Sequence, residues 1–223
     1  MGKSAVSKSI IPVLILLFLL VGSGYLLSNL LFPKKTLPVF NPIDVNPDLV
    51  DDAVASISEN HKIAPFSVVN QNGDTITEAD YKDKIYVANF FFTRCKTICL
   101  PMMANMRDLQ DVYIDDPDVK FLSYSVTPVI DSVSVLKTYA DKRGVIQEKW
   151  NITTGNKKHI YNLARKSYFA VLDEGDGDLQ DFIHTERFIL IDKKSQIRGF
   201  YDGTDTEEMK RLMADIKILK REK

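Results

Sequence analysis

The chain has 223 residues, of which 45% are hydrophobic, enough to bury one sizeable core and to form one globular domain. Lysine and arginine together (29) nearly balance aspartate and glutamate (30), and no block of like charge is long enough to form a nucleic-acid-binding surface. The composition therefore argues against a DNA or RNA partner.

The first feature along the chain is a long apolar run. No charged residue lies between Ser9 and Pro33, and residues 10–32 are dominated by Leu, Ile and Val. A helix over this range would span roughly 34 Å, enough to cross the hydrocarbon core of a bilayer. We therefore predict a tail and transmembrane helix over 1–32. A cleaved signal peptide ending near residues 22–24 is the alternative, although the run is longer than a signal peptide needs.

The orientation of the predicted helix in the membrane follows less directly from the sequence, because lysines flank the apolar run at both ends. The short N-terminal tail favours an N-in orientation with nearly all of the chain outside. No Arg-rich amphipathic presequence precedes the run, so a bacterial inner membrane fits better than mitochondrial import. We expect a single-pass protein whose C-terminal domain lies in the oxidising periplasm.

Beyond the apolar run, residues 33–58 contain four prolines among polar and acidic residues and are predicted to be a spacer. From residue 59 to 223, short β-rich runs alternate with helical periodicity, which predicts an α/β domain. Asn72-Gly73 predicts a hairpin between strands at 66–69 and 75–77. The almost continuous apolar run at 85–92 predicts a central strand that is covered on both faces.

The remaining elements follow from periodicity and capping. We expect a helix opening at Pro101, a strand near 119–126, and helices near 132–142 and 156–168. Strands at 188–191 and 197–201 should form a second hairpin. A capping box over 204–207 should start the last helix, whose apolar stripe should pack into the core: Met209, Leu212, Met213, Ile216 and Leu219.

The only two cysteines, Cys95 and Cys99, directly follow the predicted central strand and precede a helix. Ligands gather at this edge of open α/β sheets. The helix N-terminus and the nearby Arg94 and Lys96 favour thiolates, which are both better metal ligands and better nucleophiles. Buried, inert cysteines are the alternative.

Three histidines could complete a site. His159 lies on a polar helix face, and His61 lies at the start of the domain with no apolar strand beside it. His184 lies just before the strand at 188–191, and it would lie beside the cysteines if that strand ran antiparallel to 85–92. Two thiolates and one imidazole suit Cu(I) or Cu(II), whereas a structural zinc site would need a fourth protein ligand.

Four segments in order resemble the Sco/SenC family of copper proteins: 91–99 (FFTRCKTIC), 123–128 (SYSVTP), 150–155 (WNITTG), and His184 before 188–192 (FILID). The resemblance implies a thioredoxin-like fold with a mixed central sheet flanked by helices. It also implies copper ligation by Cys95, Cys99 and His184, and a role in assembling the copper site of cytochrome c oxidase. The partner would be the copper-bearing subunit of that oxidase or another copper acceptor.

The chain departs from this pattern at two places. Leu100 separates the second cysteine from Pro101, and Thr127 stands where the family commonly has aspartate, although Asp131 lies close by in the sequence. Neither change touches the three implied ligands. Both put a redox or partner-recognition role of these loops in question.

The rival interpretation is an enzyme, a thiol-disulfide oxidoreductase that acts on protein cysteines in the periplasm through a redox-active Cys95–Cys99 pair. The four-residue spacing and the lack of any proline after Pro128 argue against it. The acidic segment 173–178 suggests calcium, but it lacks the full spacing of a calcium loop, so a solvated loop is expected.

Overall fold

The computed structural model describes residues 7–31, 35–46, 59–171 and 183–222. The chain divides into two compact units, Met1–Thr36 and Leu37–Lys223. The first unit contains helix α1, Ser7–Leu31. Among the described residues, no helix combines the length and the apolar character needed to cross a membrane. The transmembrane helix therefore stays a prediction from the sequence.

The second unit is built on one seven-stranded mixed sheet, in the order β2-β1-β5-β4-β3-β6-β7. Strand β3 lies between β4, to which it is parallel, and β6, to which it is antiparallel. The strand after His184 is thus antiparallel to β3, which is the condition for the predicted approach of His184 to the cysteines. The strands are β1 Ser67–Asn70, β2 Thr75–Thr77, β3 Ile85–Phe91, β4 Val119–Ser125, β5 Trp150–Thr154, β6 Arg187–Ile191 and β7 Ile197–Asp202.

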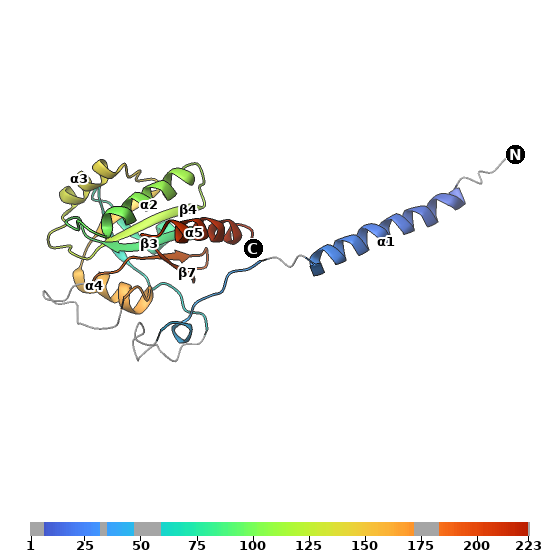
Figure 1. Cartoon of the computed structure of the whole chain (residues 1–223), viewed down its shortest axis with the longest axis horizontal. Coiled ribbons are helices and arrows are strands. Elements are labelled where there is room, and N and C mark those ends of the chain that lie inside the picture. Colours follow the sequence, from blue (N-terminus) through green and yellow to red (C-terminus); the bar gives the residue numbers. More distant parts are fainter. Residues whose placement is uncertain (1–6, 32–34, 47–58, 172–182, 223) are drawn as a thin grey trace. The chain divides into compact units, whose positions relative to one another are not determined.

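Helices cover both faces of this sheet (Figure 1). One face carries α2 (Cys99–Val112), α3 (Val133–Arg143) and α5 (Thr206–Leu219), and the other carries α4 (Lys157–Asn162), which continues into a π-helical turn, Leu163–Ser167. Short 3-10 turns lie at Pro42–Asp44 and Glu78–Tyr81. This is the α/β architecture that the sequence predicts.

Strand β3 forms the centre of the core, and every residue from Ile85 to Phe91 is buried. Its even-numbered side chains pack with the core beneath α4, whereas Ile85, Val87 and Phe91 pack beneath α2, α3 and α5. A run without alternation is what a strand covered on both faces requires. The packing fixes the end of β3, where the chain leaves the sheet toward Cys95.

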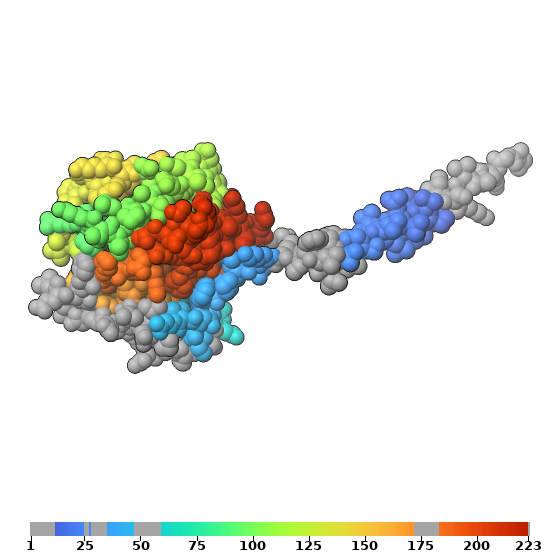
Figure 2. All heavy atoms as spheres, in the orientation of Figure 1, coloured from blue at the N-terminus to red at the C-terminus, as the bar shows by residue number. Residues whose placement is uncertain are grey.

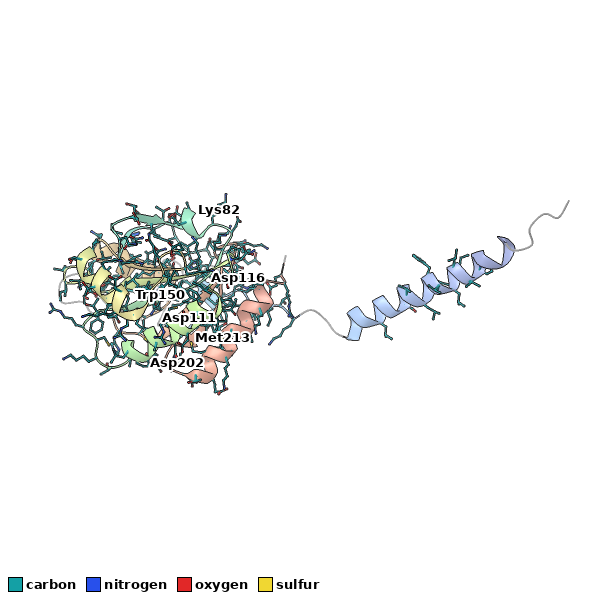
Figure 3. All side chains as sticks on the ribbon, turned by 90° about the horizontal axis from the view of Figure 1, so that it is seen from above. Lys82, Asp111, Asp116, Trp150, Asp202 and Met213 are labelled. Carbon is teal, nitrogen blue, oxygen red and sulfur yellow. The ribbon has the colours of Figure 1, made fainter. Side chains whose placement is uncertain are left out.

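The sequence missed one strand and shifted three boundaries. Strand β5 carries Trp150, whose fully buried side chain lies inside the unit (Figure 3). Helix α2 begins at Cys99 rather than at Pro101, and the helix expected over 156–168 changes to a π-helical turn at Leu163. Helix α5 is capped by Asp205, whose side chain accepts the backbone N–H groups of Glu207 and Glu208, and not by Thr204.

Part of the expected spacer belongs to the second unit. The N–H of Phe40 donates to the carbonyl of Ile197 (2.9 Å), and Figure 2 shows this segment lying along the C-terminal atoms. Arg198 fastens it, because its guanidinium donates to the carbonyls of Leu37 (2.7 Å) and Pro38 (2.9 Å). The prolines of this segment did not prevent it from packing. Residues 47–58 of the spacer lie outside the described residues.

We expect Arg198→Ala to lower the free energy of unfolding by about 3 kcal/mol, because it leaves a buried carboxylate unpaired. Arg198 is 8% exposed and forms ion pairs with Asp192 (2.8 Å) and Glu222 (2.6 Å). Urea unfolding measures the change. Lys210→Ala, which removes an exposed pair with Glu207, is the control and should leave the midpoint unchanged. Equal midpoints for the two variants would contradict the role of Arg198.

Candidate metal centre

The two cysteines meet where the chain passes from β3 into α2. Cys99 is the first residue of α2, and its backbone N–H donates to the sulfur of Cys95 at 3.3 Å. The hydroxyl of Thr97 lies 3.7 Å from the same sulfur. Both cysteines are buried and neither forms a disulfide. The sulfur of Cys95 thus satisfies a backbone donor at the start of a helix, where such donors have no partner within the helix.

The two thiols are electrostatically unequal. Burial opposes ionisation of Cys95, but hydrogen bonds from Cys99 and Thr97 outweigh it and lower the pKa of the Cys95 thiol. Burial, together with the hydrogen bond to Cys95 and the nearby charges of Cys95 and Asp131, raises the pKa of the Cys99 thiol to about 12. The pair therefore loses its first proton from Cys95, with Cys99 acting as the hydrogen-bond donor that stabilises the thiolate.

Asp131 organises the loop that carries the cysteines. Its carboxylate is fully buried and accepts hydrogen bonds from the Thr93 hydroxyl (2.5 Å) and backbone N–H (3.2 Å). It also accepts from the hydroxyls of Ser125 (2.6 Å) and Thr127 (3.0 Å). One carboxylate thus joins the ends of β3 and β4 and the loop that follows β4.

The sequence suggested only that Asp131 lies near the proline loop, and it did not reveal this network. Thr127, at one of the two departures from the family pattern, is one of the four donors to the carboxylate. A buried carboxylate needs several donors to offset its desolvation. The sequence does show a single acidic residue near hydroxyl-bearing residues. That these hydroxyls reach the carboxylate depends on the parallel pairing of β3 with β4, which the sequence does not show.

His184 lies exposed in the segment that leads into β6. The register of β3 and β6 ends with Asn89 opposite Phe188. Because β6 begins at Arg187 and is antiparallel to β3, His184 precedes β6 at the end of the sheet where β3 leads into the cysteine loop. In the part of the chain that the structure describes, however, no three His, Cys, Asp or Glu side chains come together closely enough to hold a metal. The structure brings the two sulfurs together but not the imidazole.

The other two histidines lie elsewhere in the fold. The Nε2 of His61 lies 2.8 Å from the carbonyl of Ser167, and burial lowers the pKa of its imidazole. His159, expected to be solvated, is half-buried on α4, and its Nε2 accepts the backbone N–H of Ser67 at 3.4 Å. Both imidazoles have structural partners. The acidic segment 173–178 lies outside the described residues.

Comparison with known proteins identifies the family. The chain matches the SCO1/SenC family over residues 54–220. It is 31% identical over 160 residues to the SCO1 protein homolog of Bacillus subtilis, covering 71% of this chain and 82% of that protein. The chain belongs to the SCO1/SenC family. The resemblance of the four sequence segments is therefore confirmed.

Solved structures of SCO1/SenC proteins share the fold. A SCO1/SenC family lipoprotein from Bacillus anthracis is 31% identical with a TM-score of 0.64, covering 72% of this chain and 96% of its own. BsSco, described as a member of the Sco family of cytochrome c oxidase assembly proteins with a disulfide switch, is 31% identical with a TM-score of 0.62, covering 74% and 96%. The expected thioredoxin-like α/β fold is thus confirmed for the second unit.

Asp131→Ala should destabilise this SCO1/SenC protein by about 2 to 3 kcal/mol, because it leaves the buried Ser125 hydroxyl and the Thr93 N–H without their acceptor. Urea unfolding measures the loss. Asp141→Ala, which removes a largely exposed carboxylate paired with Lys137, is the matched control and should have little effect. If the control destabilised the protein as much as Asp131→Ala, the network would not be the cause.

The rate of alkylation should distinguish the two thiols. At about pH 8, iodoacetamide should modify Cys95 much faster than Cys99, because only Cys95 has a lowered pKa and the thiolate is the nucleophile. Cys99→Ala removes a hydrogen bond to the thiolate, so the reaction of Cys95 should shift to higher pH. Peptide mapping by mass spectrometry measures both rates. Equal rates at the two sulfurs would contradict the asymmetry.

Proposed function

We propose that this protein is a membrane-anchored copper metallochaperone that binds one copper ion and assists assembly of the copper site of cytochrome c oxidase. The observation that carries the proposal is the pair of free, adjacent sulfurs at the end of β3 in a chain of the SCO1/SenC family. Two structures that share the fold, ScoI of Arabidopsis thaliana and Sco1 of yeast, were determined with copper bound.

The chemistry of the donor set fits copper. The ligands proposed are the sulfurs of Cys95 and Cys99 and the imidazole of His184. Soft thiolates select Cu(I), and an added imidazole accommodates Cu(II), so this set serves either oxidation state. The lowered pKa of Cys95 makes its thiolate the easier of the two to form, whereas the raised pKa of Cys99 makes its proton harder to release. Copper uptake through both sulfurs should therefore release protons and strengthen as the pH rises.

The strand register supports His184 as the third ligand. Strand β6 begins at Arg187 and runs antiparallel to β3, so the segment before it approaches the edge where the cysteine loop begins. His184 is exposed, which leaves its imidazole accessible. In this proposal, residues 183–186 move toward the sulfurs when copper binds. His61 and His159 are engaged elsewhere and take no part.

The anchor and the location belong to the same proposal. The uncharged run between Ser9 and Pro33 is helical over Ser7–Leu31 and would hold the second unit at the outer face of a bacterial inner membrane. The cysteines would then work on the periplasmic side, where the copper-bearing domain of an oxidase subunit would meet them. Metal would pass to cysteine ligands of that acceptor while both proteins share it.

A thiol-disulfide oxidoreductase is the second candidate. The unequal pKa values of Cys95 and Cys99 favour it, because a thiolate beside a protonated thiol is the arrangement that attacks a disulfide and then resolves the mixed disulfide. BsSco, at 31% identity, was found to contain a disulfide switch. In this alternative the two cysteines are oxidised as the acceptor's disulfide is reduced, and His184 has no role.

We expect the reduced protein to bind one copper ion per chain and His184→Ala to weaken binding on the order of 100-fold or more, since it removes one of three ligands. Competition with a Cu(I) chelator measures the affinity. The control is His159→Ala, which removes an imidazole remote from the sulfurs and should bind copper as the unaltered protein does. Unchanged affinity in His184→Ala would overturn the three-ligand site. Rapid reduction of protein disulfides without metal would favour the enzyme.

A further inference from the structure

The exposed apolar side chains of the second unit are concentrated around the cysteines. Seven large hydrophobic side chains are exposed among the described residues of this unit, and four of them lie on segments that adjoin the sulfurs: Leu100, Val129, Ile130 and Val135. We call these four residues the apolar rim. The other three, Ile43, Val112 and Ile146, are on other segments.

The segments that carry the apolar rim are fastened to the cysteine loop. Leu100 directly follows Cys99, and Val129 and Ile130 directly precede Asp131, whose carboxylate accepts two hydrogen bonds from Thr93. Val135 lines an open hollow of about 390 Å³ together with Thr93, Tyr139 and Lys142. The Tyr139 ring lies 5.6 Å from that of Phe91 and packs against the core cluster that contains Cys95 and Cys99, so this hollow adjoins the cysteine loop.

The side chains of the apolar rim are exposed beside buried polar residues. Val129 is 78% exposed, although the neighbouring Asp131 is fully buried. Exposed apolar side chains gathered on segments that adjoin one site are typical of a surface where another protein binds. Because the loop is fixed by Asp131 at four hydrogen bonds, the rim is presented in a defined position rather than on a loose segment.

The charge beside the apolar rim is positive. Residues 92–106 contain Arg94 and Lys96 but no acidic residue, and both side chains are exposed. Lys142 adds a third cation at the hollow. Residues 126–142 contain two carboxylates: that of Asp131 is buried and holds the loop, and that of Asp141 is paired with Lys137 at 2.9 Å. The surface on the cysteine-loop side therefore complements an apolar patch that is edged by aspartate or glutamate.

We propose that the apolar rim, with Arg94, Lys96 and Lys142, is the docking surface for the acceptor protein, and that the acceptor presents an apolar patch edged by carboxylates around its own copper ligands. This inference rests on the proposed function and names the surface chemistry of its partner. An acceptor that reaches the buried sulfurs must cover the rim. Apolar contact then excludes water during transfer, and the cations guide the approach.

Binding of metal-free partners tests the docking surface separately from copper ligation. The probe is the purified copper-bearing domain of a cytochrome c oxidase subunit from the same organism, titrated by calorimetry against the full chain in detergent. We expect the double variant Val129→Ser, Ile130→Ser to weaken binding about tenfold or more, since two apolar contacts are lost. Lys142→Glu should weaken binding at low salt and less at high salt.

The matched control is the double variant Val112→Ser, Ile146→Ser. These residues are exposed to 59% and 39%. Val112 ends the helix that Cys99 begins, and Ile146 lies in the loop before β5, at the opposite end of the sheet. The control should bind within about twofold of the unaltered chain, because exposed substitutions away from a contact change little.

Four results would overturn the proposal. Two concern the variants: undiminished binding by the Val129, Ile130 variant, or an equal loss in the control. The other two are no binding of the probe by the unaltered chain, and a self-associated chain that the rim variant makes monomeric. Copper stoichiometry is measured on the same variants and should remain one per chain. In the unaltered chain, copper binding without probe binding would be a failure of this inference alone, whereas probe binding without copper binding would be a failure of the proposed function.

Discussion

The structure depends on the pairing of β3 with two neighbours of opposite direction. Parallel pairing with β4 brings the loop after Ser125 beside the loop after Phe91, and antiparallel pairing with β6 brings the segment before Arg187 to the same end of the sheet. All seven residues of β3 are buried, so a slip of one residue would exchange the side chains packed on its two covered faces and disrupt both cores. Three segments that are distant in sequence therefore meet at one edge, where the sulfurs are found and where a third ligand can arrive.

Two polar features prepare this edge for chemistry. The Asp131 carboxylate accepts four hydrogen bonds and fixes the loop that carries the cysteines. The sulfur of Cys95 caps helix α2 by accepting the N–H of Cys99. The same contacts make the sulfurs unequal, because hydrogen bonds favour the thiolate at Cys95 while burial favours the thiol at Cys99. A metal site and a redox pair share these requirements, which is why the two candidate functions use the same atoms. They differ in their need for His184.

The first hairpin, the central strand and the shared site of the two cysteines could be predicted from the sequence because each has a local signal. These signals are Asn72-Gly73, an unbroken apolar run, and two cysteines four residues apart directly after that run. Strand β5 was missed because Trp150 to Thr154 is short and does not alternate, although Ile152, Thr153 and Thr154 before Gly155 favour a strand. The role of Asp131 could not be predicted, because its hydrogen-bond donors come from the loop after β3 and from the end of β4, which are distant in the sequence. The packing of Leu37 and Pro38 against Arg198 was equally invisible, because it joins the two ends of the domain.

The central claim is that two sulfurs and the imidazole of His184 hold one copper ion, although the structure brings only the sulfurs together. X-ray absorption at the copper edge tests it most directly, on the reduced full chain loaded with one equivalent of Cu(I). The account predicts two sulfur ligands and one nitrogen ligand, with the imidazole scattering lost in His184→Ala. A spectrum with sulfur ligands alone, or one that His184→Ala leaves unchanged, would contradict it.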